Sequence, residues 1–591
     1  MTDDTLADLF SLRSELLAAG RSWADELGDV HASHRESARN LAHYLALRRH
    51  DLRRLQPELT RLGLSSLGRT EAHVFAGVDA ATTAAARLAG IDPPTEPPAG
   101  PVPTFDTGPA LLAERTAALL GPEPEGRTTR IMVTLPSEAA TDPALVRRFV
   151  DEGMDCARIN CAHDGPDAWR SMAANVRSAA ADAGRPIAIM TDLAGPKIRT
   201  GGLRHEPGVV KVRPRRDPYG NVLEPARVEL RTTATGTADV IGVPVELHDG
   251  AELAVGTRLR LRDARGSRRR LLVVSRTAHG WIAETRRTTY LVEGTELRAE
   301  DGLTAVVGGL PLRPVPPRLQ IGDHLVLTDG AEPAAATGPD RISCTAPEII
   351  DDLRAGQPVW FDDGKFGSVV ERVDDREAHL RITRAPPGGA PLKPEKGINL
   401  PGTELHVEAL STRDRADLAV VAEFADCVAL SFVQRPGDID LLLEQLDRID
   451  ARHLGVVIKI ESQVAFERLP ELAMALMRHE RVGVMIARGD LAVECGFERL
   501  AEVQEEIMWL CEAAHMPAVW ATQVLETLAK TGRPSRAEIT DAAMGDRAEC
   551  VMLNKGPYVD EAIALLVDIF GRMQTHQSKK RALLRRLRSW S

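Results

Sequence analysis

The chain lacks the sequence features of secreted, membrane-spanning and zinc-binding proteins. Its seven cysteines are scattered without a CxxC pair, which argues against a structural zinc site. It contains no run of about eighteen apolar residues, so we expect no segment to span a membrane. The first ten residues carry acidic side chains and no positive stretch before an apolar core, unlike a secretory signal. We therefore expect a reduced, cytoplasmic protein.

An excess of basic charge is also missing. The chain has 74 Lys and Arg against 85 Asp and Glu, a net charge of −11. This balance argues against a nucleic-acid partner held by bulk electrostatics. At 591 residues the chain is too long for one hydrophobic core, so we expect roughly three or four domains.

The first part of the chain has the pattern of a helical module. Leucines recur at helical spacing within residues 1–90, for example at 9, 12 and 16. The proline-rich stretch IDPPTEPPAGPVP follows, and it predicts a linker over residues 91–126 because proline joins neither helices nor strand ladders.

Short β-branched runs alternating with helical stretches begin at residue 127. Eight strands are predicted: TRIMVT at 129, CARIN at 156, PIAIMTD at 186, CVALSFV at 427, GVVIKIE at 455, VGVMIARGD at 482, PAVWAT at 517 and CVMLNK at 550. Eight parallel strands are the number that closes a (β/α)8 TIM barrel. The fold class is therefore α/β, with the barrel over residues 127–202 and 397–575.

A long insertion separates the third and fourth of these strands. Residues 203–396 contain alternating stretches such as TRLRLRD and AHLRITR, typical of one or two all-β units forming a lid. The insertion also contains a weak internal repeat: GTRLRLRDARG at 256 and a later GTEL parallel GQPVWFDDGKFG at 356 and a second GTEL. We expect the lid to be duplicated, and residues 576–591 to be a basic tail that is a solvated helix end more often than a binding arm.

Charged and polar residues follow the predicted barrel strands where each strand ends. In a β/α barrel these carboxyl-terminal ends carry the reactive groups. The candidates are Arg158, Asn160, His163, Asp192, Lys197, Arg199, Lys459, Glu461, Gly489, Asp490 and Thr522. Two carboxylates for a divalent metal, together with several cations, suit phosphoryl transfer, because the transition state of that reaction spreads negative charge over the phosphoryl oxygens.

At these residues the chain resembles the pyruvate kinases. The motifs RINCAH, TDLAGPKIRTG, DDG, KGINLPG, LSFVQ, IKIES, ARGDLAVE, ATQVLETL and RPSRAEITDAA occur in the family's order. The resemblance covers residues 127–202 and 397 to about 570, and the lid matches in part. It implies a glycolytic kinase that transfers a phosphoryl group between phosphoenolpyruvate and ADP, giving pyruvate and ATP.

The resemblance also implies roles for individual residues. Glu461 and Asp490 would hold Mg²⁺ or Mn²⁺, and Lys459 would face the phosphoryl group in transfer. The Gly489 and Asp490 amides with Thr522 would bind the substrate carboxylate, and Thr522 lies where the family delivers a proton to the enolate. Arg158 and Arg199 would bind phosphate and nucleotide, with Asn160 and His163 close by. Asp363, in the lid, would close over the site and exclude water. A lone histidine such as His163 is as often structural as reactive.

The chain departs from the family pattern at the monovalent cation site. It keeps Asn160 and Asp192, but Ala162 and Leu193 replace two hydroxyl residues, and Lys197 stands where K⁺-dependent members carry Glu. A lysine ammonium is a tethered monovalent cation. We therefore predict activity without K⁺, with Asn160, Asp192 and Lys197 forming the substitute site.

Two further departures leave other functions open. The loop after the eighth strand reads NKGPYVDE in place of the family's SGETA run, and TLPSE lacks a glycine of the usual TIGPAS turn. A non-catalytic regulatory or binding protein on this fold is one alternative, and a lyase using metal-enolate chemistry on a 2-oxo acid is another. No membrane partner is expected, and a homo-oligomeric state stays open.

Overall fold

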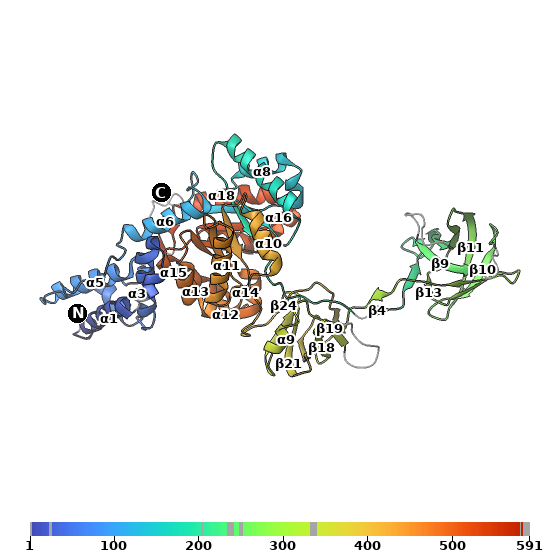
Figure 1. The fold of residues 1–591 in the computed structure, drawn as a ribbon, viewed down its shortest axis with the longest axis horizontal. Helices are drawn as coiled ribbons and strands as arrows, with labels where there is room; N and C mark the ends of the chain where they lie inside the picture. The colour runs from blue at the N-terminus through green and yellow to red at the C-terminus, as the bar shows by residue number, and fades with distance from the viewer. Residues whose placement is uncertain are drawn as a thin grey trace.

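The computed structural model describes residues 3–22, 26–203, 205–232, 241–247, 252–330, 340–579 and 581–582. A β/α barrel forms the body of the molecule, N-terminal helices lie against one side of it, and two β units extend away from it (Figure 1). The predicted fold class is thereby confirmed. Among the described residues, no helix combines the length and apolar character that crossing a bilayer requires.

The barrel is closed by eight parallel strands. In spatial order they are β1 (Arg130–Thr134), β2 (Cys156–Asn160), β3 (Ala188–Asp192), β25 (Cys427–Leu430), β26 (Gly455–Ile460), β27 (Val482–Ala487), β28 (Ala518–Ala521) and β29 (Cys550–Leu553). Each coincides with a strand predicted from sequence. Because β29 pairs in parallel with β1, all eight carboxyl ends meet at one mouth.

Helices surround this barrel in the expected alternation. They are α7 (Pro143–Glu152), α8 (Pro166–Ala183), α10 (Thr412–Val421), α11 (Pro436–Arg448), α12 (Gln463–Glu467), α13 (Leu469–Leu476), α14 (Arg488–Cys495), α15 (Leu500–Ala514), α16 (Glu526–Thr531), α17 (Arg536–Gly545) and α18 (Val559–Met573). Their ends are set locally: Asp142 caps α7, where its side chain accepts from the Leu145 amide. Ser411 and Asp414 form a capping box that starts α10.

The N-terminal module consists mainly of α1 (Asp3–Ser22), α3 (Arg35–Leu47), α4 (Leu55–Arg61) and α5 (Val74–Leu88). The stretch of prolines after it has no regular structure. The range 91–126, expected to be a linker, also contains helix α6 (Thr107–Leu120). This helix packs at the amino-terminal end of the barrel, where Leu119 lies so close to Gly455 that a β-carbon there would be 2.5 Å from Leu119 Cδ1.

The insertion folds into two all-β units. The distal unit is a closed barrel of β8 (Ala226–Arg231), β9 (Gly242–Leu247), β10 (Arg258–Arg262), β11 (Arg268–Arg276), β12 (Gly280–Thr285), β14 (Glu296–Arg298) and β15 (Thr304–Val307). The proximal unit is a sheet of β18 (His324–Thr328), β19 (Asp340–Ser343), β20 (Pro358–Phe361), β21 (Phe366–Asp374), β22 (Glu377–Arg384) and β24 (Ile398–Asn399). The proximal unit lies next to the barrel and the distal unit stands at the far end of the molecule (Figure 1).

Both units share one strand order. The run β14-β10-β11-β12-β8-β9 of the distal unit corresponds to β24-β20-β21-β22-β18-β19 of the proximal unit, and the last pairs of the two runs, β8–β9 and β18–β19, are both parallel. The distal unit adds β15, which closes it into a barrel. This shared order is what a duplicated lid requires, and the duplication itself stays a prediction. The expected basic tail lies mostly outside the described residues.

Candidate functional site

A buried ammonium group lies at the centre of the barrel mouth. Lys459 is near the end of β26, and its Nζ lies 2.8 Å from Glu461 Oε1 and 3.4 Å from Asp192 Oδ1. The same ammonium donates a hydrogen bond to Ser431 Oγ at 3.0 Å. Strands β3, β25 and β26 therefore each contribute a partner at one point, because their carboxyl ends are neighbours in the barrel.

Arg158 extends this cluster onto β2. Its Nε donates to Asp192 Oδ2 at 3.1 Å, and its Nη2 makes a second, shorter contact with the same oxygen. Its Nη1 donates to Thr134 Oγ1 at 3.0 Å. In the β2–β3 register Asn160 lies opposite Asp192, so the alternation predicted from RIN places Arg158 and Asn160 on the side of β2 next to this carboxylate.

The ionisation states of these groups follow from their mutual contacts. Burial opposes the charge of Asp192, but Lys459 and Arg158 outweigh it and hold the pKa at about 2. Burial also opposes the charge of Lys459, yet Asp192 and Glu461 raise its pKa to about 12. The centre thus keeps its charges at neutral pH because each buried ion has a partner of opposite sign.

Asp490 provides a further carboxylate at the barrel mouth. It follows β27, in the first turn of α14. Burial, followed by the nearby charge of Glu461, raises its pKa to about 6, and Lys459 and Lys197 act in the opposite direction. Asp363 of the proximal β unit contributes to the same shift. These couplings bring Glu461, Asp490 and Asp363 into one electrostatic site.

Lys197 belongs to the same site. Burial, with the repulsion of Lys459, lowers its pKa, while Asp192 and Glu461 favour its charged form. Its ammonium therefore lies in the field of Asp192.

Thr522 is held in a strained backbone conformation at the end of β28. Its φ is 63° and that of Gln523 is 57°, in the left-handed region that β-branched residues rarely adopt. The Gly489 amide donates to Thr522 Oγ1 at 2.8 Å. Arg488 supports this arrangement, since its Nε donates to the Ala521 carbonyl at 3.0 Å and its Nη1 pairs with Asp541.

The hairpin turn of the proximal unit meets the barrel at α14. Asp362 and Asp363 both have a φ of 54°, and Asp362 pairs with Lys396 at 2.7 Å. A β-carbon on Gly364 would lie 3.6 Å from Val493 Cγ2. On the same helix, Glu494 Oε1 accepts from the Leu400 amide at 3.1 Å. The turn that carries Asp363 is therefore packed over the barrel mouth.

The remaining predicted residues lie around this centre. Asn160 Oδ1 accepts from the Ala162 amide at 3.0 Å. Burial, then the charges of Lys555 and Lys197, lowers the pKa of His163. Arg199 is about one-third exposed, and its Nη1 lies 3.8 Å from Glu395 Oε2. No described contact joins these three side chains directly to Lys459.

Sequence reasoning assigned no role to Ser431 or Lys555. Ser431 is fully buried, receives the Lys459 hydrogen bond and donates to the Leu193 carbonyl at 2.9 Å. Its signal was its place in LSFVQ at the end of the fourth strand. Lys555 lies in the altered NKGP loop, and its charge acts on His163.

The donor set fits a divalent metal held with substrate. No cluster of three or more potential metal ligands occurs in the described part of the chain, but the negative charge of Glu461 contributes to the raised pKa of Asp490. Mg²⁺ is commonly bound by one or two carboxylates with the remaining ligands from substrate phosphate and water. A cation between these two carboxylates would relieve their repulsion.

Comparisons with known proteins show the family of the barrel. A family model for the barrel domain of pyruvate kinase matches residues 126–216 and 309–563. The chain is 25% identical over 450 residues to the pyruvate kinase of Geobacillus stearothermophilus, covering 75% of this chain and 56% of that protein. It is 27% identical over 431 residues to that of Mycobacterium tuberculosis strain H37Rv, covering 72% and 65% respectively. The chain thus spans less than two thirds of the length of these curated relatives.

A solved structure shows a similar fold. The crystal structure of a pyruvate kinase from Cryptosporidium parvum matches with a TM-score of 0.52 and 21% identity, over 78% of this chain and 72% of that one. At this identity the likeness concerns the fold alone. Since the family model matches more than half of the residues, the chain belongs to the pyruvate kinase family.

Proposed function

We propose that the protein is an active pyruvate kinase, a Mg²⁺-dependent phosphotransferase that moves a phosphoryl group from phosphoenolpyruvate to ADP. The observation that carries this proposal is the Lys459 ammonium, which lies 2.8 Å from Glu461 Oε1 and in the field of Asp490. A fixed cation beside two carboxylates suits a reaction whose main requirement is to position and neutralise a phosphoryl group.

In this proposal each residue of the centre has one task. The phosphorus–oxygen bond of phosphoenolpyruvate breaks, and a bond to a β-phosphate oxygen of ADP forms. Lys459 stabilises the negative charge on the transferring group, and Arg158 binds phosphate. The bound metal, held by Glu461 and Asp490, would neutralise phosphate and carboxylate charge.

The product enolate then takes up a proton at its terminal carbon and becomes pyruvate. Thr522 lies at the end of β28, and its hydroxyl oxygen accepts a hydrogen bond from the Gly489 amide. It would take part in delivering this proton. Asp363, carried over the mouth by the proximal unit, would close the site and exclude water. Arg199, Asn160 and His163 would border the nucleotide.

In this proposal the Lys197 ammonium takes the place of a bound monovalent cation. Asp192 and Glu461 favour its charged form, so the ammonium supplies a positive charge where family members that need K⁺ bind the ion. We infer that turnover proceeds without K⁺.

The test is a coupled assay in which released pyruvate is reduced with NADH. With phosphoenolpyruvate, ADP and Mg²⁺, the purified full chain should turn over at a rate typical of kinases, roughly 1–100 per second. Omitting either ADP or Mg²⁺ should abolish pyruvate formation. Pyruvate formed without ADP would support the lyase alternative, and no turnover at all would support the regulatory one.

Substitution of the central lysine tests the assigned role. Lys459→Ala should lower kcat by several orders of magnitude, because a preorganised cation can no longer neutralise the transferring group. The matched control is Lys530→Ala, which removes an exposed lysine paired with Glu526 on α16 and should leave kcat unchanged. Equal activity of the two variants would contradict the proposal.

A further inference from the structure

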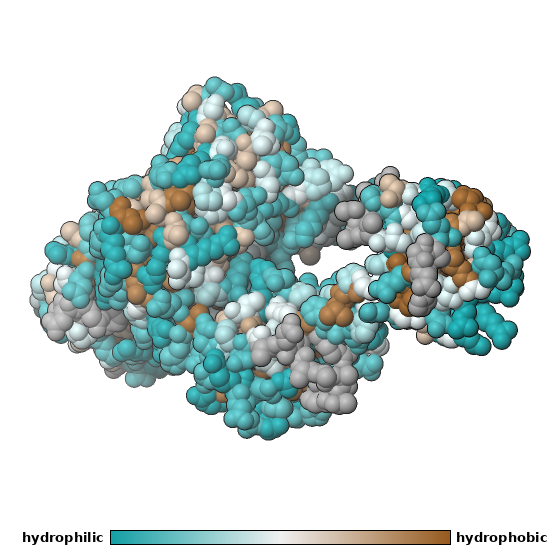
Figure 2. Space-filling model, turned by 45° about the vertical axis from the view of Figure 1, so that its right-hand side comes forward, coloured by the Kyte–Doolittle hydropathy of each residue, from teal (hydrophilic) through white to brown (hydrophobic). Residues whose placement is uncertain are grey.

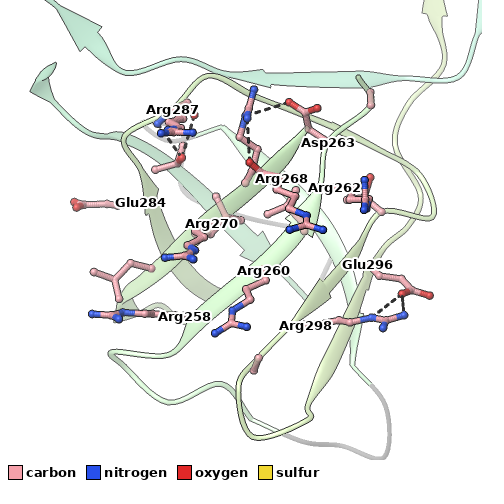
Figure 3. A pocket seen from close by; sticks show the side chains of 18 of the residues that line it. Arg258, Arg260, Arg262, Asp263, Arg268, Arg270, Glu284, Arg287, Glu296 and Arg298 are labelled. Atoms are coloured by element: carbon pink, nitrogen blue, oxygen red, sulfur yellow. Dashed lines mark hydrogen bonds and ion pairs between the residues drawn. The ribbon is translucent and has the colours of Figure 1, made fainter. Parts of the chain in front are cut away.

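Arginines crowd one outer face of the distal β barrel. We call this set the arginine face: Arg258, Arg260 and Arg262 of β10, Arg268 and Arg270 of β11, and Arg298 of β14. On β10 they alternate with the buried Leu259 and Leu261, so the period of the strand directs the arginine side chains outward. Figure 3 shows their guanidinium groups standing on the same side of the sheet.

Five of these six arginines lie directly opposite another arginine across the strands, and Arg258 lies opposite Leu272. In the β10–β11 register Arg260 pairs with Arg270, and Arg262 with Arg268. Across the other edge of β10, Arg260 pairs with Arg298 of β14. Like charges in directly opposed positions destabilise a sheet, so this register costs stability in the absence of an anion.

Neighbouring carboxylates neutralise only part of this charge. Arg260 pairs with Glu300 at 2.7 Å, and Arg298 with Glu296. Within the residues that the structure describes, the guanidinium groups of Arg258, Arg268 and Arg270 make no ion pair or hydrogen bond. Two nearby carboxylates are engaged elsewhere: the buried Asp263 by Arg265 and Arg269, and Glu284 by Arg227 at 3.0 Å.

The face borders a hollow large enough for an extended ligand. Its volume is about 1510 Å³, and nine arginines and five carboxylates line it. Its lining contains no lysine and no aromatic residue. Guanidinium groups bind phosphate through two parallel hydrogen bonds, whereas single-stranded nucleic acid is usually held by aromatic stacking as well. The composition therefore favours phosphate groups without bases.

The arginines are not needed by the fold. In the corresponding hairpin of the proximal unit, Pro358 and Trp360 occupy the positions of Arg258 and Arg260, and the same strand order forms there. The match to the pyruvate kinase barrel also omits residues 217–308, which contain the whole arginine face. The face is thus a property of this chain's distal unit and is separate from the candidate active site.

We propose that the arginine face binds linear inorganic polyphosphate. Successive arginines on one strand are about 6.8 Å apart, and neighbouring strands about 4.8 Å apart, so the face presents a row of cations longer than a single phosphate can engage. A flexible chain with a negative charge on every unit can meet several guanidinium groups at once. Such a ligand neutralises the opposed arginines that the sheet leaves uncompensated.

The test measures binding of fluorescently labelled polyphosphate to the full chain by anisotropy, at several salt concentrations. The variant Arg258→Gln/Arg268→Gln/Arg270→Gln should bind at least tenfold more weakly and with a shallower salt dependence, because fewer counterions are released. The matched control, Arg147→Gln/Arg170→Gln/Arg448→Gln, removes three exposed, carboxylate-paired arginines from barrel helices and should bind as the unmodified chain does. Inorganic phosphate at equal phosphate concentration should not compete.

A second measurement uses the melting temperature. Without polyphosphate, the arginine-face variant should melt higher than the unmodified chain, because the two opposed arginine pairs between β10 and β11 are gone. With polyphosphate, the unmodified chain should gain stability and the variant should not. Absence of binding, equal binding by the two triple variants, or equally tight binding of single-stranded DNA of matched charge would each overturn the proposal.

Discussion

Asp192 and Glu461 both stabilise the buried Lys459 ammonium and keep it charged for the proposed reaction. Lys459 is buried, and Asp192 and Glu461 raise its pKa to about 12. An unpaired ammonium in this position would lose its proton, because burial favours the neutral form. The carboxylates therefore keep a positive charge where the proposed reaction needs one. Removing either carboxylate should cost stability as well as activity, since a buried charge would be left without a partner.

Lys197 provides the first prediction for a single residue. The unmodified chain should show the same kcat with and without K⁺. In Lys197→Glu the tethered cation is replaced by an anion, so activity without K⁺ should fall at least tenfold and KCl should restore part of it. The coupled assay in buffers free of Na⁺ and K⁺ measures both effects.

A surface substitution separates this effect from a general change of charge. Lys211→Glu alters an exposed lysine of the distal unit and should leave both activity and K⁺ response unchanged. Recovery of an inactive unmodified chain by KCl alone would contradict the role given to Lys197.

Ser431 provides the second prediction. Its hydroxyl accepts from Lys459 Nζ at 3.0 Å and donates to the Leu193 carbonyl at 2.9 Å. In Ser431→Ala the Lys459 ammonium keeps its two carboxylate partners but loses the hydrogen bond to Ser431 that helps to orient it. We expect kcat to fall about tenfold, corresponding to about 1.4 kcal/mol, with little change in the KM for ADP.

Another buried serine offers a control for the lost hydrogen bond. Ser368 donates to the Val359 carbonyl at 2.9 Å within the proximal unit. Ser368→Ala should lower the melting temperature by a similar amount and leave kcat unchanged. If both variants lose kcat equally, Ser431 acts only on stability.

Among the elements, the N-terminal module is joined to the barrel by neutral histidines. His34 Nε2 donates to the Glu480 carbonyl at 2.7 Å, and its buried Nδ1 has no hydrogen-bond partner among the described residues. His515 Nδ1 lies 2.8 Å from Ser37 Oγ and its Nε2 donates to the Ala72 carbonyl at 2.8 Å. Burial, with Arg115 nearby, lowers the pKa of each ring to about 3.

Acid should therefore weaken the docking of this module. The unfolded histidines take up protons near pH 6.5, whereas the folded rings do so only near pH 3, so the unfolded state binds more protons between these values. The contribution of these two histidines to stability should be constant above about pH 7 and fall as the pH drops below 6.5, by about 2 kcal/mol per histidine at pH 5. Urea unfolding at pH 7.5 and pH 5 measures the difference.

Substitution of one ring tests its share of this slope. His34→Gln keeps a donor and removes the titrating group, so its stability should fall less between pH 7.5 and pH 5 than that of the unmodified chain. The exposed His453 is the control, and His453→Gln should keep the full slope. Equal slopes in all three proteins would exclude His34 as a cause.

On the scale of the whole molecule, the distal unit is an insertion whose first and last residues lie next to one another. The chain enters through β4 (His205–Glu206) and leaves through β16 (Arg313–Pro314), and these two short strands pair antiparallel with Glu206 opposite Arg313. The distal unit has a hydrophobic core of its own. Figure 2 shows it as a separate lobe with an opening between it and the rest of the molecule, and Figure 1 shows the extended chain segments that join it to the proximal unit.

Excision of this unit should leave the rest intact. Replacing residues 207–312 with a short Gly-Ser linker joins two neighbouring strands, so the loop-closure cost is small. We expect kcat within about twofold of the full chain, as most active-site contacts come from barrel strand ends. Turnover and circular dichroism of the shortened chain are the measurements. Loss of activity in a folded product would show that the distal unit contributes to catalysis.

Much of the architecture could be predicted from sequence, because it depends on local patterns. Each barrel strand is a short β-branched run, and strand-terminal residues such as Arg158 and Glu461 are recognisable from the run itself. The helix in residues 107–120 was hidden by the prolines before it, and its position depends on contact between Leu119 and glycines more than three hundred residues later.

The sequence by itself determined the barrel, the insertion and the order of the charged strand ends. Only the tertiary structure decided that Ser431 joins Lys459 to Leu193, that neutral histidines hold the N-terminal module, and that arginines of β10, β11 and β14 stand opposite one another. The physical reason is the range of the interactions. Periodicity and capping act between residues close in sequence, whereas strand register and buried charge pairing join residues that only the closed barrels bring together.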